Sequence, residues 1–158
     1  MTPASPGVPA QDRLVLDTNV FVAAGFNPAS NAAAVVEAVR EGRYRFAWAE
    51  ATRGETEAVI RRIPGLDWER FACLFAAADE HRGPLDVSSF SRVEDPGDRK
   101  FAALAAATGA VLITSDAHLL SCRDELPVTV STPRELVGGS APRKPGPGNR
   151  VEEEPCPS

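Results

Sequence analysis

The stretch AVLITSD, residues 110–116, contains the clearest strand pattern in the chain. Its apolar, partly β-branched run without polar alternation is typical of a strand buried on both faces of a sheet. The shorter run LVL, residues 14–16, has the same character, and it ends in Asp17 just as the longer run ends in Asp116. We therefore predict two buried strands, each followed by an aspartate.

Helix-like segments separate these runs from further strand-like ones. We expect additional strands at 44–48 and 127–130, with a weak candidate at 85–87, and helices over 27–40, 52–63, 67–78 and 97–108, with a short terminal helix from Thr132. Glycine and proline mark several boundaries, such as Pro64-Gly65 and Gly109. Strands that alternate with helices predict an α/β protein whose parallel sheet carries helices on both faces.

Only the middle of the chain has the composition of a folded domain. The length of 158 residues suits one domain with some tail rather than two domains. Residues 1–12 are rich in proline and small residues, and residues 138–158 are dense in proline, glycine and charge. We predict a flexible N-terminus at 1–12, one folded domain at 13–137 and a disordered tail at 138–158.

Composition excludes several kinds of protein. No apolar run approaches the ~20 residues of a membrane-spanning helix, and the N-terminus lacks the pattern of a secretory signal. Three cysteines without a CxxC pair argue against a disulfide scaffold and a cysteine zinc site, so the cytoplasm is the expected location. The formal net charge of −5 excludes a basic coat for nucleic acid. Phosphate contacts would need a local arginine face. We expect most of its candidates to be ordinary solvated charges: Arg40, Arg43, Arg45, Arg53, Arg61 and Arg62.

The two strand-end aspartates are the first candidates for chemistry. In open α/β sheets, ligands bind beyond the carboxyl ends of the strands. If the two strands are parallel neighbours, Asp17 and Asp116 emerge on the same edge. Either residue alone is more often a helix cap or a turn residue, but the pair favours a site.

Two helical acids are further candidates. Asp98 shares a helix face with Phe101 and Ala105, which directs its carboxylate toward the sheet edge, and Glu55 leads the inward face of its helix. Each has a structural alternative: an acid in a first helical turn is favoured by the dipole, and Glu55 could form a capping box with Thr52. Asp95, before Pro96, reads equally well as an N-cap.

Four acids in one place would repel each other unless a cation neutralises them or some stay protonated. Oxygen-only ligands suit Mg²⁺ or Mn²⁺ better than zinc. Such an ion activates water and stabilises charge on a phosphate, so metal-dependent hydrolysis of a phosphodiester by water follows as a hypothesis. Glycine-rich phosphate loops, a Gly-x-Ser-x-Gly elbow and paired histidines are absent from the sequence.

Four short motifs occur in an order that resembles a known family. They are VLDTNV at 15–20, Glu55 followed by Val59-Ile60, DPGD at 95–98 followed by FAALA at 101–105, and AVLITSD with its Thr-x-Asp ending. Together they resemble the motifs of the PIN-domain nucleases, and within these the toxin components of bacterial toxin–antitoxin pairs. The similarity covers about residues 13–137.

The resemblance implies a fold, an activity and partners. It implies a three-layer α/β/α sandwich with a central, mainly parallel sheet, a Mg²⁺ or Mn²⁺ cofactor, cleavage of single-stranded RNA, a homodimer and an antitoxin protein that blocks the site. The catalytic and metal-binding residues would be Asp17, Glu55, Asp98 and Asp116. Asn19 and Thr114 would support them by holding carboxylates or water through hydrogen bonds.

Three other interpretations remain open at this stage. The chain could be a nuclease for RNA processing or decay without a toxin role. It could be a PIN-like binding module without catalysis, although the presence of all four acids argues against this. It could also be an α/β domain whose acids only cap helices and turns.

Overall fold

The computed structural model describes residues 13–138. The strands and helices follow one another in this order: β1 (Arg13–Leu16), α1 (Thr18–Phe26), α2 (Asn31–Arg40), β2 (Arg45–Phe46), α3 (Glu50–Arg62), α4 (Glu69–Ala72), η2 (Ala77–Asp79), η3 (Val87–Phe90), α5 (Pro96–Thr108), β3 (Val111–Ile113), α6 (Ala117–Ser121), η4 (Arg123–Glu125), β4 (Val130–Ser131) and α7 (Pro133–Val137), where η marks a 3₁₀ helix. The predicted N-terminal segment 1–12 and all but Gly138 of the predicted tail 138–158 lie outside the described residues.

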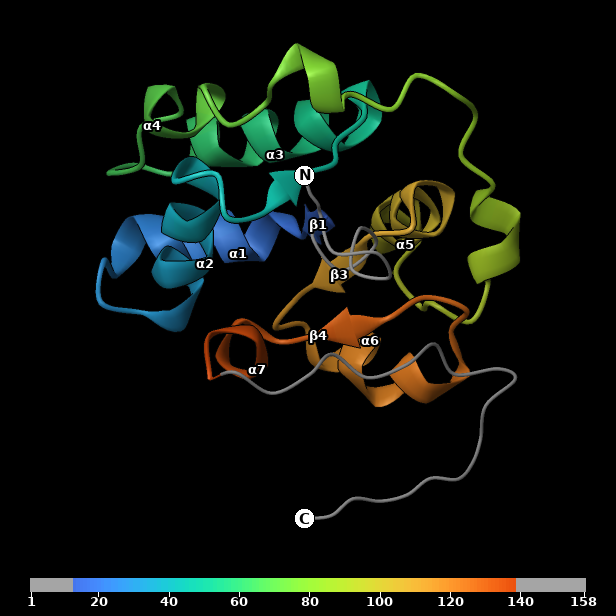
Figure 1. Ribbon diagram of the computed structural model, residues 1–158. Helices are drawn as coiled ribbons and strands as arrows, with labels where there is room; N and C mark the ends of the chain where they lie inside the picture. Colours follow the sequence, from blue (N-terminus) through green and yellow to red (C-terminus); the bar gives the residue numbers. More distant parts are fainter. Residues whose placement is uncertain (1–12, 139–158) are drawn as a thin grey trace, which may run out of the picture.

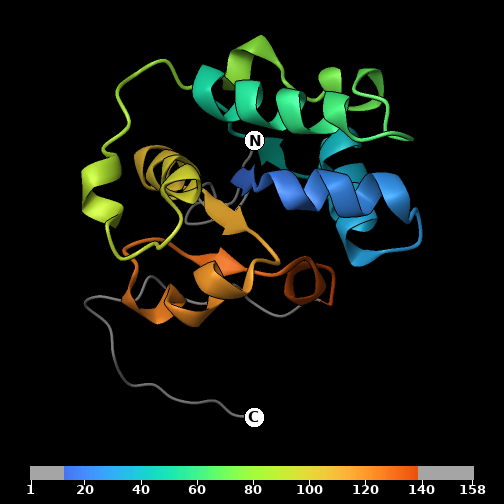
Figure 2. The ribbon, with the colours of Figure 1, turned by 180° about the vertical axis from the view of Figure 1, so that it is seen from behind.

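The four strands form one sheet in the order β2-β1-β3-β4, and all neighbouring pairs are parallel. Figures 1 and 2 show the sheet between two groups of helices, with α1 and α2 on one side and α5 on the other. The prediction of an α/β protein with a parallel sheet covered on both faces is therefore confirmed. The two aspartate-ending strands are direct neighbours, since Leu16 pairs with Ile113.

Each face of the sheet has its own hydrophobic core. Side chains of a strand alternate between faces, so Leu14 and Leu16 pack with α1 and α2, while Val15 packs with α5. Leu112 lies in the same core as Val15. Residues 14–16 of β1 and all of β3 are buried, which explains why these runs are apolar without alternation.

Helix α1 is an element that the sequence patterns did not predict. Its residues TNVFVAAGF are apolar on nearly every side, so they lack the one-sided period by which an amphipathic helix is recognised. The helix packs between α2 and α3, and its buried residues include Val20 and Phe21. The predicted helix 27–40 consequently begins later, at Asn31, capped by Ser30, whose Oγ accepts a hydrogen bond from the Ala33 N–H.

Two other sequence expectations are wrong in the middle of the chain. The strand expected at 85–87 is the approach to the 3₁₀ helix η3, because the Asp86 carboxylate accepts hydrogen bonds from the hydroxyls of Ser88 and Ser89 and turns the chain. The helix expected over 67–78 ends at Ala72. After the helix the backbone forms hydrogen bonds with Trp48 instead. The Trp48 N–H donates to the Asp79 carbonyl, and the Trp48 carbonyl accepts from the His81 N–H.

No helix in the described range 13–138 has the length and apolar character to cross a membrane.

Candidate metal centre

Asp17 and Asp116 lie at the carboxyl ends of neighbouring strands, as the sequence predicted. Asp17 directly follows β1, and its N–H donates to the Ile113 carbonyl at 3.1 Å, which extends the pairing of the two strands. Asp116 comes after β3 and caps α6, with Oδ1 accepting from the His118 N–H at 2.8 Å. Asp17 is only 2% exposed. Parallel pairing therefore brings the two carboxylates to one edge of the sheet.

Thr114 joins these two aspartates. Its hydroxyl donates to Asp17 Oδ2 at 2.8 Å and accepts from the Asp116 N–H at 3.0 Å. The side chain is fully buried, so its rotamer is held by packing as well as by hydrogen bonds. Thr114 thus fixes the orientation of Asp17 and the position of the backbone at Asp116; its role in supporting a metal site stays a prediction.

Helix α5 contributes the third carboxylate, that of Asp98. Asp95 is the N-cap of this helix, with Oδ1 accepting from the Gly97 N–H at 2.9 Å, so the capping interpretation of Asp95 is confirmed. The cap places Asp98 in the first turn, where it is buried. One carboxylate oxygen from each of Asp17, Asp98 and Asp116 lies within 4.8 Å of the other two.

Burial and mutual repulsion make ionisation of this cluster costly. Burial, the contact with the Asp116 carboxyl and the charge of Asp17 raise the pKa of Asp98 to about 7. Burial also raises the pKa of Asp17; the Thr114 hydrogen bond opposes this rise, and the charge of Asp116 adds to it. At neutral pH the cluster therefore shares a proton, or it needs a cation in place of one.

A divalent cation fits the residues that are present. Asp98 Oδ2 is buried and accepts no hydrogen bond from any described residue, and an unpaired buried carboxylate oxygen is unfavourable without a partner. An ion among the three aspartates would supply that partner and relieve their repulsion. The donors are all carboxylate oxygens, which hard ions such as Mg²⁺ and Mn²⁺ prefer.

Glu55 lies at the edge of this group and does not belong to it. The Glu55 carboxylate forms an ion pair with Lys100 Nζ at 2.5 Å. The charge of Glu55 is nevertheless near enough to the cluster to contribute to the raised pKa of Asp17. At the start of α3 the Thr52 hydroxyl accepts a hydrogen bond from the N–H of the N-cap residue Ala49, and Glu55 takes no part in this cap. Its predicted role as a metal ligand stays a prediction.

The structure departs most from the site expected from the sequence at two residues, Asn19 and Lys100. Asn19 lies in the first turn of α1 and is exposed; no hydrogen bond joins its side chain to the three aspartates within the described residues. Lys100, which no sequence motif marks as a site residue, reaches Glu55 from α5. Its position two residues after Asp98 is the one signal that could have pointed to it.

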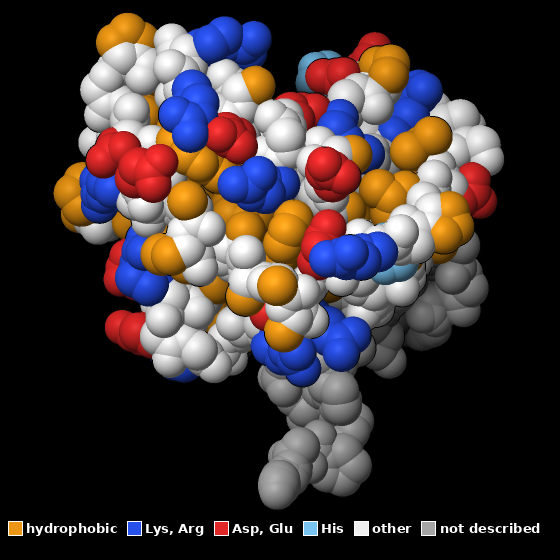
Figure 3. Space-filling view, turned by 90° about the horizontal axis from the view of Figure 1, so that it is seen from above, with side chains coloured by type: hydrophobic (Ala, Val, Ile, Leu, Met, Phe, Trp, Pro, Cys, Tyr) orange, Lys and Arg blue, Asp and Glu red, His pale blue; other side chains and the backbone are white. Residues whose placement is uncertain are grey.

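The arginines proposed for phosphate contact are largely engaged with acids. Figure 3 shows basic and acidic side chains interspersed on the face seen from above, without a large patch of one sign. On α3, Arg53 and Arg61 both pair with Glu57, at 3.4 and 2.7 Å. The described residues therefore offer no continuous basic surface on that face.

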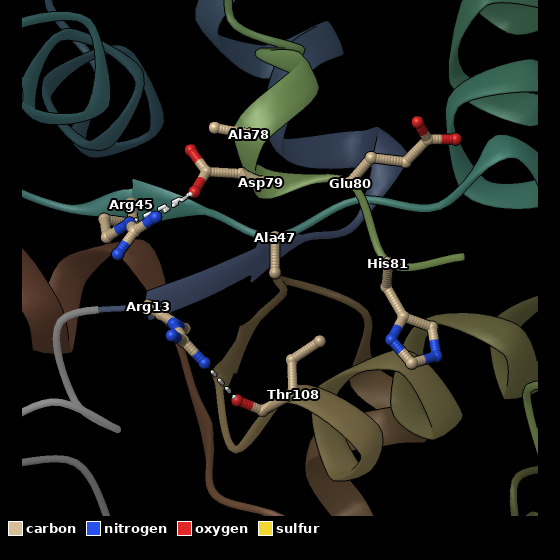
Figure 4. Close-up of a pocket in the computed structure, with 8 residues that line it drawn as sticks. All are labelled: Arg13, Arg45, Ala47, Ala78, Asp79, Glu80, His81 and Thr108. Atoms are coloured by element: carbon tan, nitrogen blue, oxygen red, sulfur yellow. Dashed lines mark hydrogen bonds and ion pairs between the residues drawn. The ribbon is translucent and has the colours of Figure 1, made fainter. Parts of the chain in front are cut away.

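A pocket of about 160 Å³ lies at the opposite edge of the sheet, where the strands begin (Figure 4). Its basic side chains already have partners: Arg45 pairs with Asp79 at 2.8 Å, and Arg13 donates to the Thr108 carbonyl at 3.1 Å. None of the three clustered aspartates lines this pocket. The aspartate cluster is therefore the better candidate for a catalytic site.

Comparison with known proteins agrees with this geometry. The family model of the PIN domain matches residues 13–118, a range that includes Asp17, Glu55, Asp98 and Asp116. None of the curated proteins matches the chain. The family match covers β1 through the start of α6 and thus every strand end that contributes an aspartate. The chain belongs to the PIN-domain family.

Proposed function

We propose that this protein is a metal-dependent endoribonuclease that cleaves single-stranded RNA. PIN domains are generally metal-dependent nucleases, and the three-aspartate cluster is where such chemistry would take place. The observation that carries the proposal is the buried, unpaired Asp98 Oδ2 beside Asp17 and Asp116. The preference for RNA rests on the sequence resemblance.

The chain's own residues have distinct tasks in this scheme. Asp17, Asp98 and Asp116 would hold Mg²⁺ or Mn²⁺, and Thr114 keeps the first of them oriented. A divalent cation, when bound, lowers the pKa of a water and stabilises negative charge on a phosphate. Asp98, whose carboxyl holds a proton near neutral pH, would release that proton on binding a cation, so cation affinity would rise with pH.

The biological role of the enzyme is a separate part of the proposal. We infer from the motif order that the enzyme is the toxin of a toxin–antitoxin pair, acts in the cytoplasm, forms a homodimer and is blocked by an antitoxin protein. An RNA-processing nuclease would share the same chemistry. Induced expression in a bacterial host separates the two roles: a toxin arrests growth, and co-expression of the protein from the adjoining gene restores it.

A cleavage assay tests the chemistry. Single-stranded RNA is incubated with the wild type and with Asp17→Asn, in Mn²⁺ or Mg²⁺ and with EDTA as a blank. Asp86→Asn serves as the matched control, because Asp86 is an exposed acid outside the cluster. A single-stranded DNA of the same sequence tests the preference for RNA.

We expect cleavage that needs the metal, persists in Asp86→Asn and is lost in Asp17→Asn. A folded wild type that binds the metal and cleaves neither RNA nor DNA would instead favour a PIN-like binding module. Equal cleavage by wild type and Asp17→Asn would show that the aspartate cluster is not the active site.

A further inference from the structure

The pairing of Glu55 with Lys100 links two helices at the edge of the aspartate cluster. Glu55 comes from α3 and Lys100 from α5, and their charged groups are 2.5 Å apart. The side chains are 32% and 22% exposed. The pair is thus partly shielded from solvent, and its interaction is screened less than that of a surface ion pair.

The surroundings hold Lys100 in place. Its Nζ donates a second hydrogen bond to the Gly97 carbonyl at 2.8 Å and lies 5.7 Å from the centre of the Phe101 ring. A Cβ at Gly97 would lie 3.8 Å from Glu55 Oε1 and 3.9 Å from Lys100 Nζ, at ordinary contact distance, so both partners lie close to this turn. The ammonium is therefore anchored to the first turn of α5, the same turn that carries Asp98.

The ion pair between Glu55 and Lys100 affects the net charge that would surround a metal ion at the aspartate cluster. Three aspartates and Glu55 would carry up to four negative charges, and Lys100 offsets one of them. The charge of Glu55 reaches the cluster, since it contributes to the raised pKa of Asp17. Removing Lys100 would leave the carboxylate of Glu55 uncompensated and free to turn toward the three aspartates.

We propose that Lys100 is a positioning residue that holds Glu55 apart from the three aspartates and thereby sets the divalent-cation affinity of the site. A cation would be held by Asp17, Asp98 and Asp116, and Glu55 with Lys100 would act as a neutral pair at the edge. The inference rests on the proposed function for the presence of a metal ion. It goes further in assigning Glu55 and Lys100 their roles.

A double-mutant cycle on Mn²⁺ affinity tests the proposal without using activity. Calorimetric titrations compare the wild type with Lys100→Met, Glu55→Gln and the double variant. Arg62→Met is the matched charge control, because Arg62 is exposed at the end of α3. Lys100→Arg keeps the positive charge and checks rescue, and circular dichroism checks that each variant is folded.

The proposal gives a distinct result for each variant. A unit charge a few ångströms from a divalent ion changes affinity by about fivefold or more even in a solvent-like dielectric. Lys100→Met should therefore tighten Mn²⁺ binding by that factor, and Glu55→Gln should weaken it. The double variant should return close to the wild type, while Lys100→Arg and Arg62→Met should stay near it.

Two results would overturn the inference. If Glu55 is a direct ligand, the double variant stays as weak as Glu55→Gln. If Lys100 has no influence on the site, Lys100→Met binds Mn²⁺ like the wild type. A wild type that binds no Mn²⁺ would instead remove the metal site of the proposed function, and the inference with it, so the two failures are distinguishable.

Discussion

Asp98 is the residue on which the acid–base behaviour of the site depends most. Its pKa of about 7 lies above the ordinary value for an aspartate, chiefly because the carboxyl is buried. Between the two values the folded protein holds a proton that the unfolded chain has released. By linkage, its contribution to the free energy of unfolding falls as pH rises through this window.

We therefore predict that the metal-free protein loses stability from about pH 5 to pH 8. Asp17 adds to the trend, because its pKa is raised in the same direction. Melting temperatures in EDTA should fall across this range, and Asp98→Asn should flatten the curve and raise the melting temperature at pH 8. A wild-type curve that rises with pH over the same range would contradict the raised pKa values.

Thr114 gives a second prediction at the scale of single residues. Thr114→Val keeps the shape of the side chain but removes the hydroxyl that serves Asp17 and the Asp116 N–H. Leaving buried polar groups unpaired costs about 1–3 kcal/mol, so the free energy of unfolding should drop by that amount. Mn²⁺ affinity should fall as well.

Thr114→Ser is the control for this experiment, because it retains the hydroxyl. It should keep a Mn²⁺ affinity close to that of the wild type. Equal Mn²⁺ affinity in Thr114→Val and Thr114→Ser would show that the hydroxyl does not orient the site.

At the scale of elements, the start of α5 decides where Asp98 points. The Asp95 cap fixes the first turn, and Asp98 follows inside it. Loss of a helix N-cap costs about 1 kcal/mol, whereas asparagine caps as well as aspartate. Asp95→Ala should lower the free energy of unfolding by about that amount, and Asp95→Asn should not.

Metal binding separates a capping role of Asp95 from a ligand role. Asp95→Asn should retain Mn²⁺ affinity to within a few-fold, with a small loss because one nearby charge disappears. A loss as large as that caused by Asp98→Asn would make Asp95 part of the metal site.

How far the sequence predicts these elements depends on where their determinants lie. Strands β1 and β3 were recognised because apolar runs buried on both faces leave a local pattern, and their aspartates follow directly. Helix α1 was missed because it is apolar all round and forms through packing between α2 and α3. The sequence of α1 therefore lacks the hydrophobic period of an amphipathic helix.

The same distinction applies to the site. Asp17, Asp98 and Asp116 follow from strand ends and helix faces, which local sequence defines. The contact between Glu55 and Lys100 joins residues of α3 and α5, and only the tertiary arrangement brings them together. Sequence patterns therefore identified Glu55 as an inward-facing acid but could not show which partner it faces.

At the scale of the whole molecule, two hydrophobic cores enclose the sheet, and α7 completes one of them. Leu136 packs against the core shared by α1 and α2, and α7 lies against α2. Arg123 and Glu135 add an ion pair at 2.9 Å beside the capping box at Thr132. These contacts all lie before Gly138.

We predict from this that a chain shortened after Val137 keeps its melting temperature to within a few degrees. A chain shortened after Ser131, which loses α7 as well, should melt distinctly lower because Leu136 and the contacts of Glu135 are removed. Calorimetry of both shortened chains beside the full chain is the measurement. A large drop for the first truncation would show that residues after Val137 stabilise the fold.

We propose that Asp17, Asp98 and Asp116 together hold a divalent cation. Its most direct test is a Mn²⁺ titration, by calorimetry or by the electron paramagnetic resonance of free Mn²⁺, of wild type, Asp98→Asn and the exposed control Asp86→Asn at pH 8. We expect binding by the wild type and Asp86→Asn, and an affinity at least about tenfold weaker in Asp98→Asn. Equal affinities in all three proteins, or no binding by the folded wild type, would contradict it.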